Sequence, residues 1–245
     1  MKSLNYAHRG FSGEYPENTM IAFEKALEAG ADGIELDVQL TSDKEVVVFH
    51  DDKLDRLTNG SGFVKDHTLE ELNQLSFDVE EREGAENYKI PTLNEYLEWS
   101  VSTPLLTNIE LKALSGEDNG LEQKVVTTLR SFNCMNQILF SSFHEESLAR
   151  IKQLAPEAQT GLLVLDCSEK EIQKVYEMGI DCIHPLGSAV NETVVKHIHK
   201  MGLKINVWTI NVEASIKEAL ANEVDGLITD YPNRVSHLQN NKVTH

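Results

Sequence analysis

The stretch EKALEAGADGIELD at residues 24–37 joins the end of an amphipathic helix, a short turn that contains Asp, and the start of an apolar strand. The same order returns in VYEMGIDCIHP at 175–185 and in EALANEVDGLITD at 218–230. A repeated unit of helix, turn and strand is typical of a parallel sheet with helical crossovers. The repeat therefore predicts an α/β fold.

Eight apolar segments of strand length recur along the chain, with helical patterns between them. They lie at 4–8, 33–38, 105–111, 138–142, 160–164, 181–185, 204–209 and 226–230. Most of the intervening helices begin at Ser, Thr or Asn and end near Gly or Pro, as helix boundaries do. Eight such units in 245 residues suit a closed (β/α)8 TIM barrel, which needs about 250. An open doubly wound sheet is the alternative, but no Gly-rich phosphate turn follows the first strand.

One segment departs from this alternation. The stretch QLTSDKEVVVFH at 39–50 turns back after too few residues for a parallel crossover, so it predicts an antiparallel β-hairpin arm on the second strand. A fold about residues 43 and 44 would place His50 opposite Asp37. The segment from 52 to about 90 is polar and irregular, and we expect it to form a small lid-like insertion. The whole chain, 1–245, is expected to be a single domain.

The composition restricts the partners of the protein. The 40 acidic and 22 basic side chains give a net charge of −18, which disfavours nucleic acid and anionic membranes. No apolar run approaches the roughly 20 residues of a membrane helix, and the N-terminus lacks a signal-peptide pattern. We therefore expect a cytoplasmic protein without integral membrane association. The sequence leaves open whether it forms a homo-oligomer.

Polar side chains fall at or beyond the ends of the predicted strands, where the active sites of such barrels lie. They include His8, Arg9, Glu35, Asp37, Glu110, Lys112, Ser141, Ser142, His184, Trp208 and Asp230. Two like charges about 4 Å apart repel by roughly 4 kcal/mol at an effective dielectric near 20, so converging carboxylates need a cation among them. Ligation by oxygen alone favours Mg²⁺ or Ca²⁺ over zinc.

An anionic substrate can reach an acidic protein only where positive charge is concentrated. A divalent cation together with Arg9 and Lys112 would supply that charge. His8 and His50 are suited to acid–base chemistry near neutral pH. The residues therefore predict a metal-assisted phosphate site.

Several short motifs carry a family resemblance. They are HRG (8–10), PENT (16–19), ELDVQLTSD (35–43), VVFHD (47–51), NIELK (108–112), SSF (141–143), VWT (207–209) and TDYP (229–232). In this order they resemble the glycerophosphodiester phosphodiesterase family, from residue 5 to about 235. The resemblance implies a phospholipase C-like TIM barrel with an insertion after the second strand. It also implies hydrolysis of a small-molecule glycerophosphodiester to glycerol 3-phosphate and an alcohol.

The same resemblance implies roles for individual residues. His8 and His50 would be the general base and acid, in an order that the sequence does not decide. Glu35, Asp37 and Glu110 would hold one divalent cation, Mg²⁺ or Ca²⁺. The remaining implied roles are phosphate binding by Arg9 and Lys112, a glycerol-site wall by Trp208, substrate contact by His184, and support near His8 by Glu17 and Asn18.

Two other functions remain as alternatives. A lysophospholipase D or sphingomyelinase D-like activity would use the same barrel, but it needs an apolar groove for which the sequence shows no amphipathic stretch. A non-catalytic phosphate-binding barrel would be favoured if a histidine or a carboxylate were missing. Both histidines and all three carboxylates are present, namely His8, His50, Glu35, Asp37 and Glu110.

Overall fold

Strands and helices alternate along the chain as the sequence predicts. The computed structural model describes residues 2–77, 88–112 and 116–242. Its strands are β1 Leu4–His8, β2 Gly33–Leu40, β3 Val46–Val48, β4 Leu106–Leu111, β5 Ile138–Ser142, β6 Gln159–Val164, β7 Cys182–Pro185, β8 Lys204–Val207 and β9 Gly226–Thr229. The helices that follow the barrel strands are α1 Met20–Glu28, α3 Leu93–Ser100, α4 Leu121–Phe132, α5 Glu145–Leu154, α6 Glu169–Glu177, α7 Glu192–Lys200, α8 Glu213–Ala221 and α9 Pro232–Lys242.

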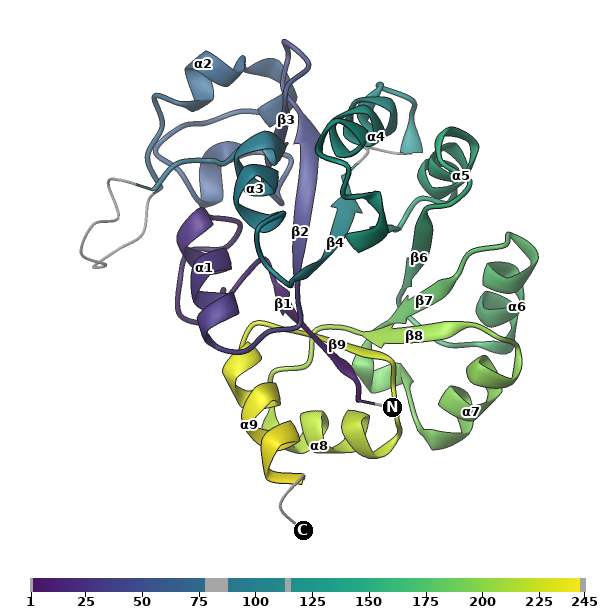
Figure 1. Ribbon diagram of the computed structural model, residues 1–245. Coiled ribbons are helices and arrows are strands. Elements are labelled where there is room, and N and C mark those ends of the chain that lie inside the picture. The colour runs from purple at the N-terminus through teal and green to yellow at the C-terminus, as the bar shows by residue number, and fades with distance from the viewer. Residues whose placement is uncertain (1, 78–87, 113–115, 243–245) are drawn as a thin grey trace.

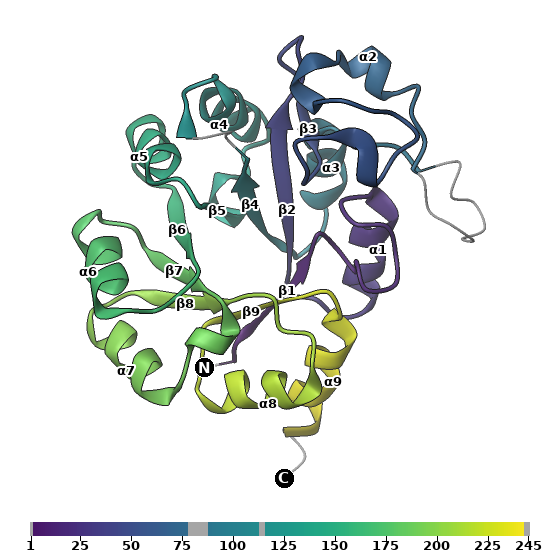
Figure 2. The same cartoon turned by 180° about the vertical axis from the view of Figure 1, so that it is seen from behind.

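The strands close into a parallel barrel. The sheet order is β1-β9-β8-β7-β6-β5-β4-β2-β3, and a further pairing of β1 with β2 joins the ends of the barrel. All pairs are parallel except β2 with β3. The helices surround the strands in both views (Figure 1, Figure 2). The TIM barrel expected from the sequence is confirmed.

Alternation along β2 explains why this strand is buried on both sides. Ile34, Leu36 and Val38 belong to the main apolar core and are fully buried. Burial of each such apolar side chain away from water stabilises the fold by roughly 1.5–3 kcal/mol. Glu35 and Asp37 occupy the alternate positions, which face the inside of the barrel. A single strand therefore supplies both the core and the acidic side chains.

The hairpin arm is confirmed, but its register differs by one residue from the expected one. Val38 pairs with Val48, and the Phe49 amide donates to the Asp37 carbonyl at 3.0 Å. Phe49, rather than His50, therefore lies opposite Asp37. The difference arises because the Thr41 amide donates to the Glu45 carbonyl, which closes a loop of three residues instead of two.

The expected insertion packs beside the hairpin and builds a small core of its own. It contains two 3₁₀ turns, η1 Leu54–Arg56 and η2 Val64–Asp66, and the short helix α2 Leu69–Leu72. The second core consists of Val47, Phe49, Leu54, Val64, Leu72, Phe77 and Ile90. The segment lies next to β2 and β3 at the edge of the molecule (Figure 1, Figure 2). Residues 78–87 of the expected lid lie outside the described residues.

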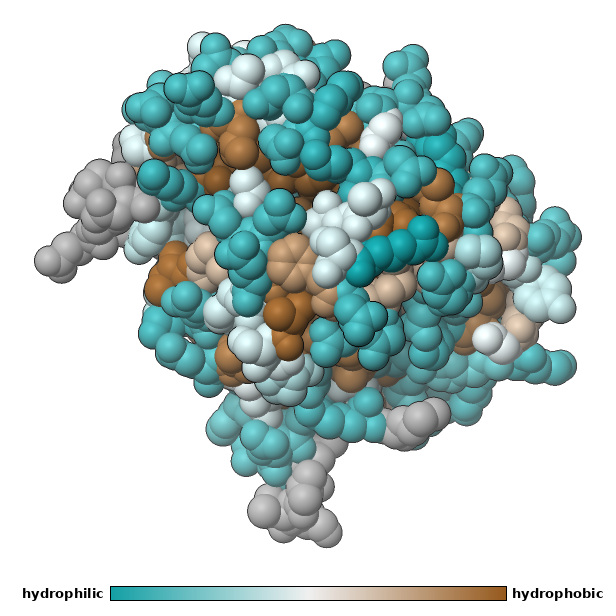
Figure 3. Space-filling view, turned by 45° about the horizontal axis from the view of Figure 1, so that its top comes forward, coloured by the Kyte–Doolittle hydropathy of each residue, from teal (hydrophilic) through white to brown (hydrophobic). Residues whose placement is uncertain are grey.

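The surface is mostly hydrophilic on one face of the molecule (Figure 3). On the face drawn in Figure 3, hydrophilic side chains cover most of the area and hydrophobic ones show in separate patches. Among the residues that the structure describes, no helix has the length and apolarity needed to span a membrane.

In the three turns of the sequence repeat, the residue after the helix C-cap has a positive φ, which favours glycine. Gly30 follows α1 with φ +80°, and Gly179 follows α6 with φ +67°. The corresponding position after α8 is Glu223, with φ 59°. These are the three turns of the sequence repeat, and in the third a residue with a Cβ adopts the left-handed conformation.

We expect Glu223→Gly to stabilise the protein by about 0.5–1 kcal/mol. The left-handed conformation costs an L-residue roughly 1–2 kcal/mol, and the entropy lost by glycine offsets about half of that gain. The free energy of unfolding, measured with urea, checks the change. Asn222→Gly at φ −77° is the matched control and should destabilise the protein. A lower stability for Glu223→Gly would contradict this interpretation.

Candidate functional site

The candidate site is a cavity of about 100 Å³ at the carboxyl end of the barrel strands. It is lined by His8, Arg9, Glu35, His50, Asn108, Glu110, Lys112, Ser141, Phe143, Leu163, Trp208, Thr209 and Ile228. Eight of these residues are among the candidates that the sequence predicts: His8, Arg9, Glu35, His50, Glu110, Lys112, Ser141 and Trp208. They derive from segments far apart in the chain, so barrel closure is what brings them together.

Three carboxylates converge at this cavity from two neighbouring strands. Parallel register pairs Asp37 of β2 with Glu110 of β4, and Glu35 lies two positions before Asp37 on the same face. One oxygen from each carboxylate lies within 4.8 Å of the others, and all three residues are buried. The predicted acidic cluster is therefore formed.

Burial and mutual repulsion oppose the ionisation of two of these carboxyl groups. Burial, followed by the charges of Asp37 and Glu110, raises the pKa of Glu35 well above its usual value. Burial and Asp37 raise the pKa of Glu110 to about 7. Burial also acts on Asp37, but Lys112 and Arg9 outweigh it and lower the pKa of Asp37 below its usual value. The cluster thus holds more acidic groups than its two cations can neutralise.

A hard divalent cation suits this donor set. All three ligands are carboxylate oxygens, which Mg²⁺ and Ca²⁺ prefer. Asp37 Oδ1 is buried and makes no hydrogen bond within the described residues, although Lys112 Nζ lies 3.2 Å away. A cation among the three oxygens would complete the coordination of Asp37 Oδ1 and relieve the repulsion.

Arg9 and Lys112 place their positive charges at the edge of the cluster. Lys112 Nζ lies 2.5 Å from Glu110 Oε1, and Arg9 Nε lies 3.4 Å from Asp37 Oδ2. Arg9 adopts φ 55°, and its amide donates to the Glu35 carbonyl at 2.8 Å. The next residue, Gly10, has φ +80° and lies so close to Ala22 that a Cβ there would clash at 2.7 Å. The HRG turn thus aims Arg9 into the barrel.

Each of the two predicted catalytic histidines is held by a carboxylate. His8 Nδ1 lies 2.6 Å from Asp230 Oδ1, and His50 Nδ1 lies 2.7 Å from Asp51 Oδ1. In a neutral ring this contact places the proton on Nδ1, which leaves Nε2 free to exchange protons. Burial, with Lys112 and Arg9, lowers the pKa of His50 despite the opposing charges of Asp37 and Asp51.

Asp230 is a partner whose role the sequence does not specify. It falls at the end of β9 and therefore belongs to the expected rim, but nothing in the sequence joins it to His8, 222 residues earlier. Ser12 and Asn211 donate to its two oxygens at 3.1 Å and 2.5 Å. Burial alone would raise the pKa of Asp230. The hydrogen bond and charge of His8, with the hydrogen bonds from Asn211 and Ser12, outweigh burial and lower this pKa below its usual value.

The supporting residues Glu17 and Asn18 contact the cations and carboxylates rather than His8. Asn18 Nδ2 donates to Asp37 Oδ2 at 2.8 Å. Glu17 Oε1 accepts from Arg9 Nη1 at 2.8 Å and also from Arg56, a residue of the insertion that no sequence motif indicates.

Trp208 forms one wall of the cavity, beside Phe143. Their rings meet edge to face with centroids 5.6 Å apart. Trp208 Nε1 donates to the carbonyl of His184 at 2.6 Å, which fixes the orientation of the indole. The resulting wall is aromatic, with Trp208 from the end of β8 and Phe143 from the end of β5.

His184 does not occupy the substrate-contacting position that the family resemblance implies. It is fully buried inside the barrel and is not among the residues that line the cavity. Its Nε2 contacts Asn206 Nδ2 at 3.0 Å, and it fills space beside Gly161, where a Cβ would lie 2.4 Å from the ring. Burial lowers the pKa of His184 to about 3, so the ring stays neutral. Its placement is that of a packing residue.

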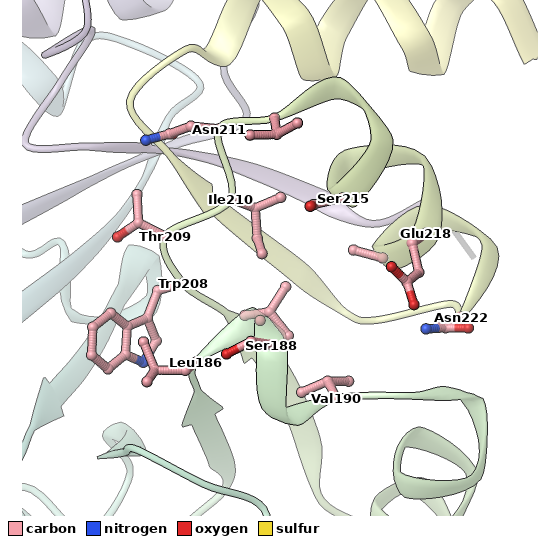
Figure 4. A pocket seen from close by; sticks show the side chains of 14 residues that line it. Leu186, Ser188, Val190, Trp208, Thr209, Ile210, Asn211, Ser215, Glu218 and Asn222 are labelled. Atoms are coloured by element: carbon pink, nitrogen blue, oxygen red, sulfur yellow. The ribbon is translucent and has the colours of Figure 1, made fainter.

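A larger neighbouring cavity of about 320 Å³ shares Trp208 and Thr209 with the candidate site. It lies between the end of β8, the turn after β7 and α8, and Trp208 is at its edge (Figure 4). Among the described residues, Glu218 is the one charged residue that lines it. It offers no group of carboxylates, histidines and cations, so we assign the chemistry to the smaller cavity.

The fold and this cavity place the chain in the class of TIM barrels with an acidic, histidine-flanked site at the carboxyl rim. Residues 8–234 match the Glycerophosphoryl diester phosphodiesterase family model. The chain therefore belongs to this family, and the resemblance seen in the sequence motifs is confirmed.

Individual relatives agree with this assignment. A glycerophosphodiester phosphodiesterase of Bacillus altitudinis is 43% identical over 234 residues, which cover 94% of this chain and 95% of that protein. One of Caldanaerobacter subterraneus subsp. tengcongensis is 39% identical over 238 residues, with 97% and 98% coverage. The structure of an Oleispira antarctica phosphodiesterase in complex with the product sn-glycerol-3-phosphate is 30% identical, with a TM-score of 0.90 and 96% of each chain covered.

We expect the affinity of the cluster for Mg²⁺ or Ca²⁺ to increase with pH. A raised carboxyl pKa means that a proton occupies the group at lower pH and must leave when the metal binds. For Glu110, whose pKa is about 7, affinity should fall up to about tenfold per pH unit below that value. Calorimetric titration in buffers of different ionisation enthalpy measures the released protons.

Glu110→Gln is the matched variant for this titration, since it keeps the shape but binds no exchangeable proton. It should bind the cation more weakly and with a smaller pH dependence. Affinity for the wild-type protein that does not change between about pH 5.5 and 8.5 would contradict the interpretation.

Proposed function

We propose that the protein hydrolyses glycerophosphodiesters to glycerol 3-phosphate and an alcohol, with one divalent cation and two histidines in acid–base roles. The convergence of His8, His50 and the carboxylate cluster on a single cavity carries this proposal. The family relatives supply the substrate class. The acidic composition of the chain agrees with a small-molecule substrate rather than a nucleic acid.

The charged residues of the cavity have separate tasks in this proposal. Glu35, Asp37 and Glu110 would hold the cation, which supplies positive charge toward the phosphate oxygens. Arg9 and Lys112 bind the remaining negative charge of the phosphodiester and orient it. Trp208 and Phe143 cover the glycerol carbons and exclude water from that side of the site.

The histidines transfer the protons of the reaction through their Nε2 atoms. One takes a proton from the attacking oxygen as that oxygen bonds to phosphorus. Attack by water gives glycerol 3-phosphate directly, whereas attack by the glycerol 2-hydroxyl gives a cyclic phosphate, in which water must then break the new bond between phosphorus and O2. The other histidine gives a proton to the departing alkoxide as its bond to phosphorus breaks. Asp51 and Asp230 keep the two rings in the required tautomer and orientation. Each such proton transfer contributes about 10²–10⁴-fold, so charge stabilisation and positioning must supply the rest.

The direct test is release of glycerol 3-phosphate by the purified protein. Glycerophosphodiesters with several head groups, glycerophosphocholine among them, should all yield glycerol 3-phosphate, and a chelator should abolish the release. Added Mg²⁺ or Ca²⁺ should restore it. No release from any head group with either cation would contradict the proposed function.

Replacing either catalytic histidine should lower turnover by at least about a hundredfold while the fold is retained. His8→Ala and His50→Ala each remove a proton-transfer group without emptying the apolar core. The kcat values, together with circular dichroism spectra that match wild type, check the expectation. His197→Ala, on the exposed face of α7, is the control and should leave kcat unchanged. Near-wild-type turnover in either catalytic variant would contradict the two-histidine assignment.

A lysophospholipid substrate is the second candidate, because apolar side chains are exposed in the segments that follow three barrel strands, and one of them, Phe143, lines the cavity. Phe143 after β5 is 44% exposed, Leu165 after β6 is 66% exposed, and Val212 before α8 is 63% exposed. An acyl chain could cover such side chains. Comparing kcat/KM for glycerophosphocholine and its lysolipid counterpart separates the two candidates, since only the second predicts a preference for the lysolipid.

A further inference from the structure

Arg56 of the insertion forms a double fork between two carboxylates near the site. Its Nε and Nη2 bind Asp51 Oδ2 and Oδ1 at 2.6 and 2.9 Å. Its Nη1 and Nη2 bind Glu17 Oε2 and Oε1 at 3.0 and 2.8 Å. Planar guanidinium groups match carboxylates in this bidentate way, and lysine cannot reproduce the geometry.

Asp51 and Glu17 each also contact a residue that lines the catalytic cavity. Asp51 Oδ1 lies 2.7 Å from His50 Nδ1, and Glu17 Oε1 lies 2.8 Å from Arg9 Nη1. The same oxygens that meet Arg56 Nη2 therefore also meet His50 and Arg9. A continuous chain of charged contacts runs from His50 through Asp51, Arg56 and Glu17 to Arg9.

The insertion holds Arg56 in a fixed place. Arg56 ends the 3₁₀ turn η1, and Leu54 at the start of that turn is fully buried in the second core. The Leu54 amide donates to the Gly62 carbonyl at 3.0 Å, and the Val64 amide donates to the Asp52 carbonyl at 2.9 Å. These two bonds tie the segment before Arg56 to residues 62–64 of the same insertion.

An isolated ion pair at the surface stabilises a protein very little, and the Arg56 side chain is 47% exposed. Here, however, the Arg56 guanidinium lies between Asp51 and Glu17, and both carboxylates accept a hydrogen bond from its Nη2. The hydrogen bond from Arg56 leads the effects that lower the pKa of Asp51 to about 2. Without Arg56, Asp51 and Glu17 would repel each other at short range, and each would move the functional side chain that it holds.

We propose that Arg56 is a positioning residue, which fixes the orientation of His50 through Asp51 and of Arg9 through Glu17. This inference rests on the proposed function. It assigns the insertion a purpose in catalysis that does not require any of its described residues to enter the cavity. Loss of Arg56 should reduce turnover through His50 and weaken phosphate binding through Arg9.

The test compares Arg56→Gln with two variants that each break one arm of the fork. Asp51→Asn should lower kcat, and Glu17→Gln should mainly raise KM. Arg56→Gln should do both, with kcat lowered about tenfold or more and KM raised about threefold. Arg56→Lys keeps the charge without the fork and should recover only part of the loss. Arg130→Gln, which removes an exposed arginine of α4 paired with Glu157, is the control.

Double variants separate positioning from general destabilisation. Adding Arg56→Gln to Asp51→Asn should change kcat little further, because both act through the same histidine. A merely structural role predicts additive losses of kcat and a parallel fall in melting temperature. Additive losses, or Arg56→Gln kinetics within about twofold of wild type, would overturn the inference. An inactive wild-type protein would instead contradict the proposed function itself.

Discussion

The site depends on one electrostatic constraint, the placement of three buried carboxylates within 4.8 Å of one another. Parallel pairing of β2 with β4 sets Asp37 beside Glu110, and the pleat adds Glu35 to the same face. Neither Arg9 nor Lys112 alone can neutralise this cluster, because burial raises the pKa of Glu35 and of Glu110 even in their presence. Three buried carboxylates this close repel one another, and a divalent cation among them would offset that cost.

The remaining contacts follow outward from that cluster in successive layers. The cations that neutralise Asp37 also point toward the cavity in which a phosphate would lie. Further carboxylates then hold the functional groups in place: Asp51 and Asp230 orient the histidines, and Glu17 orients Arg9. Positive and negative charges thus alternate from the centre to the surface. This alternation allows an acidic protein to present a local site for an anion.

Local pattern was enough to predict the barrel and most of the polar residues that line the candidate site. Strand ends and their inward positions could be read from alternation, and barrel closure then requires His8, Glu35 and Glu110 to meet. The position of His50 came out one residue wrong because the hairpin loop length depends on hydrogen bonds of Thr41 and Glu45 that the residue types do not reveal. His184 also lies at a strand end, but whether such a residue reaches the cavity depends on the neighbouring strands. Gly161 leaves room for its ring inside the barrel.

Contacts between side chains far apart in the sequence could not be predicted from local pattern. The pairs Asp230 with His8 and Arg56 with Glu17 are examples. A crystal structure of the protein grown with Mn²⁺, an oxygen-seeking ion with a usable anomalous signal, would show whether the carboxylate cluster binds a divalent cation. We expect one anomalous peak bounded by Glu35, Asp37 and Glu110, with His8 and His50 both facing the adjoining cavity. A cluster without a peak at saturating Mn²⁺, with its carboxylates paired only to Arg9 and Lys112, would contradict the proposed metal site.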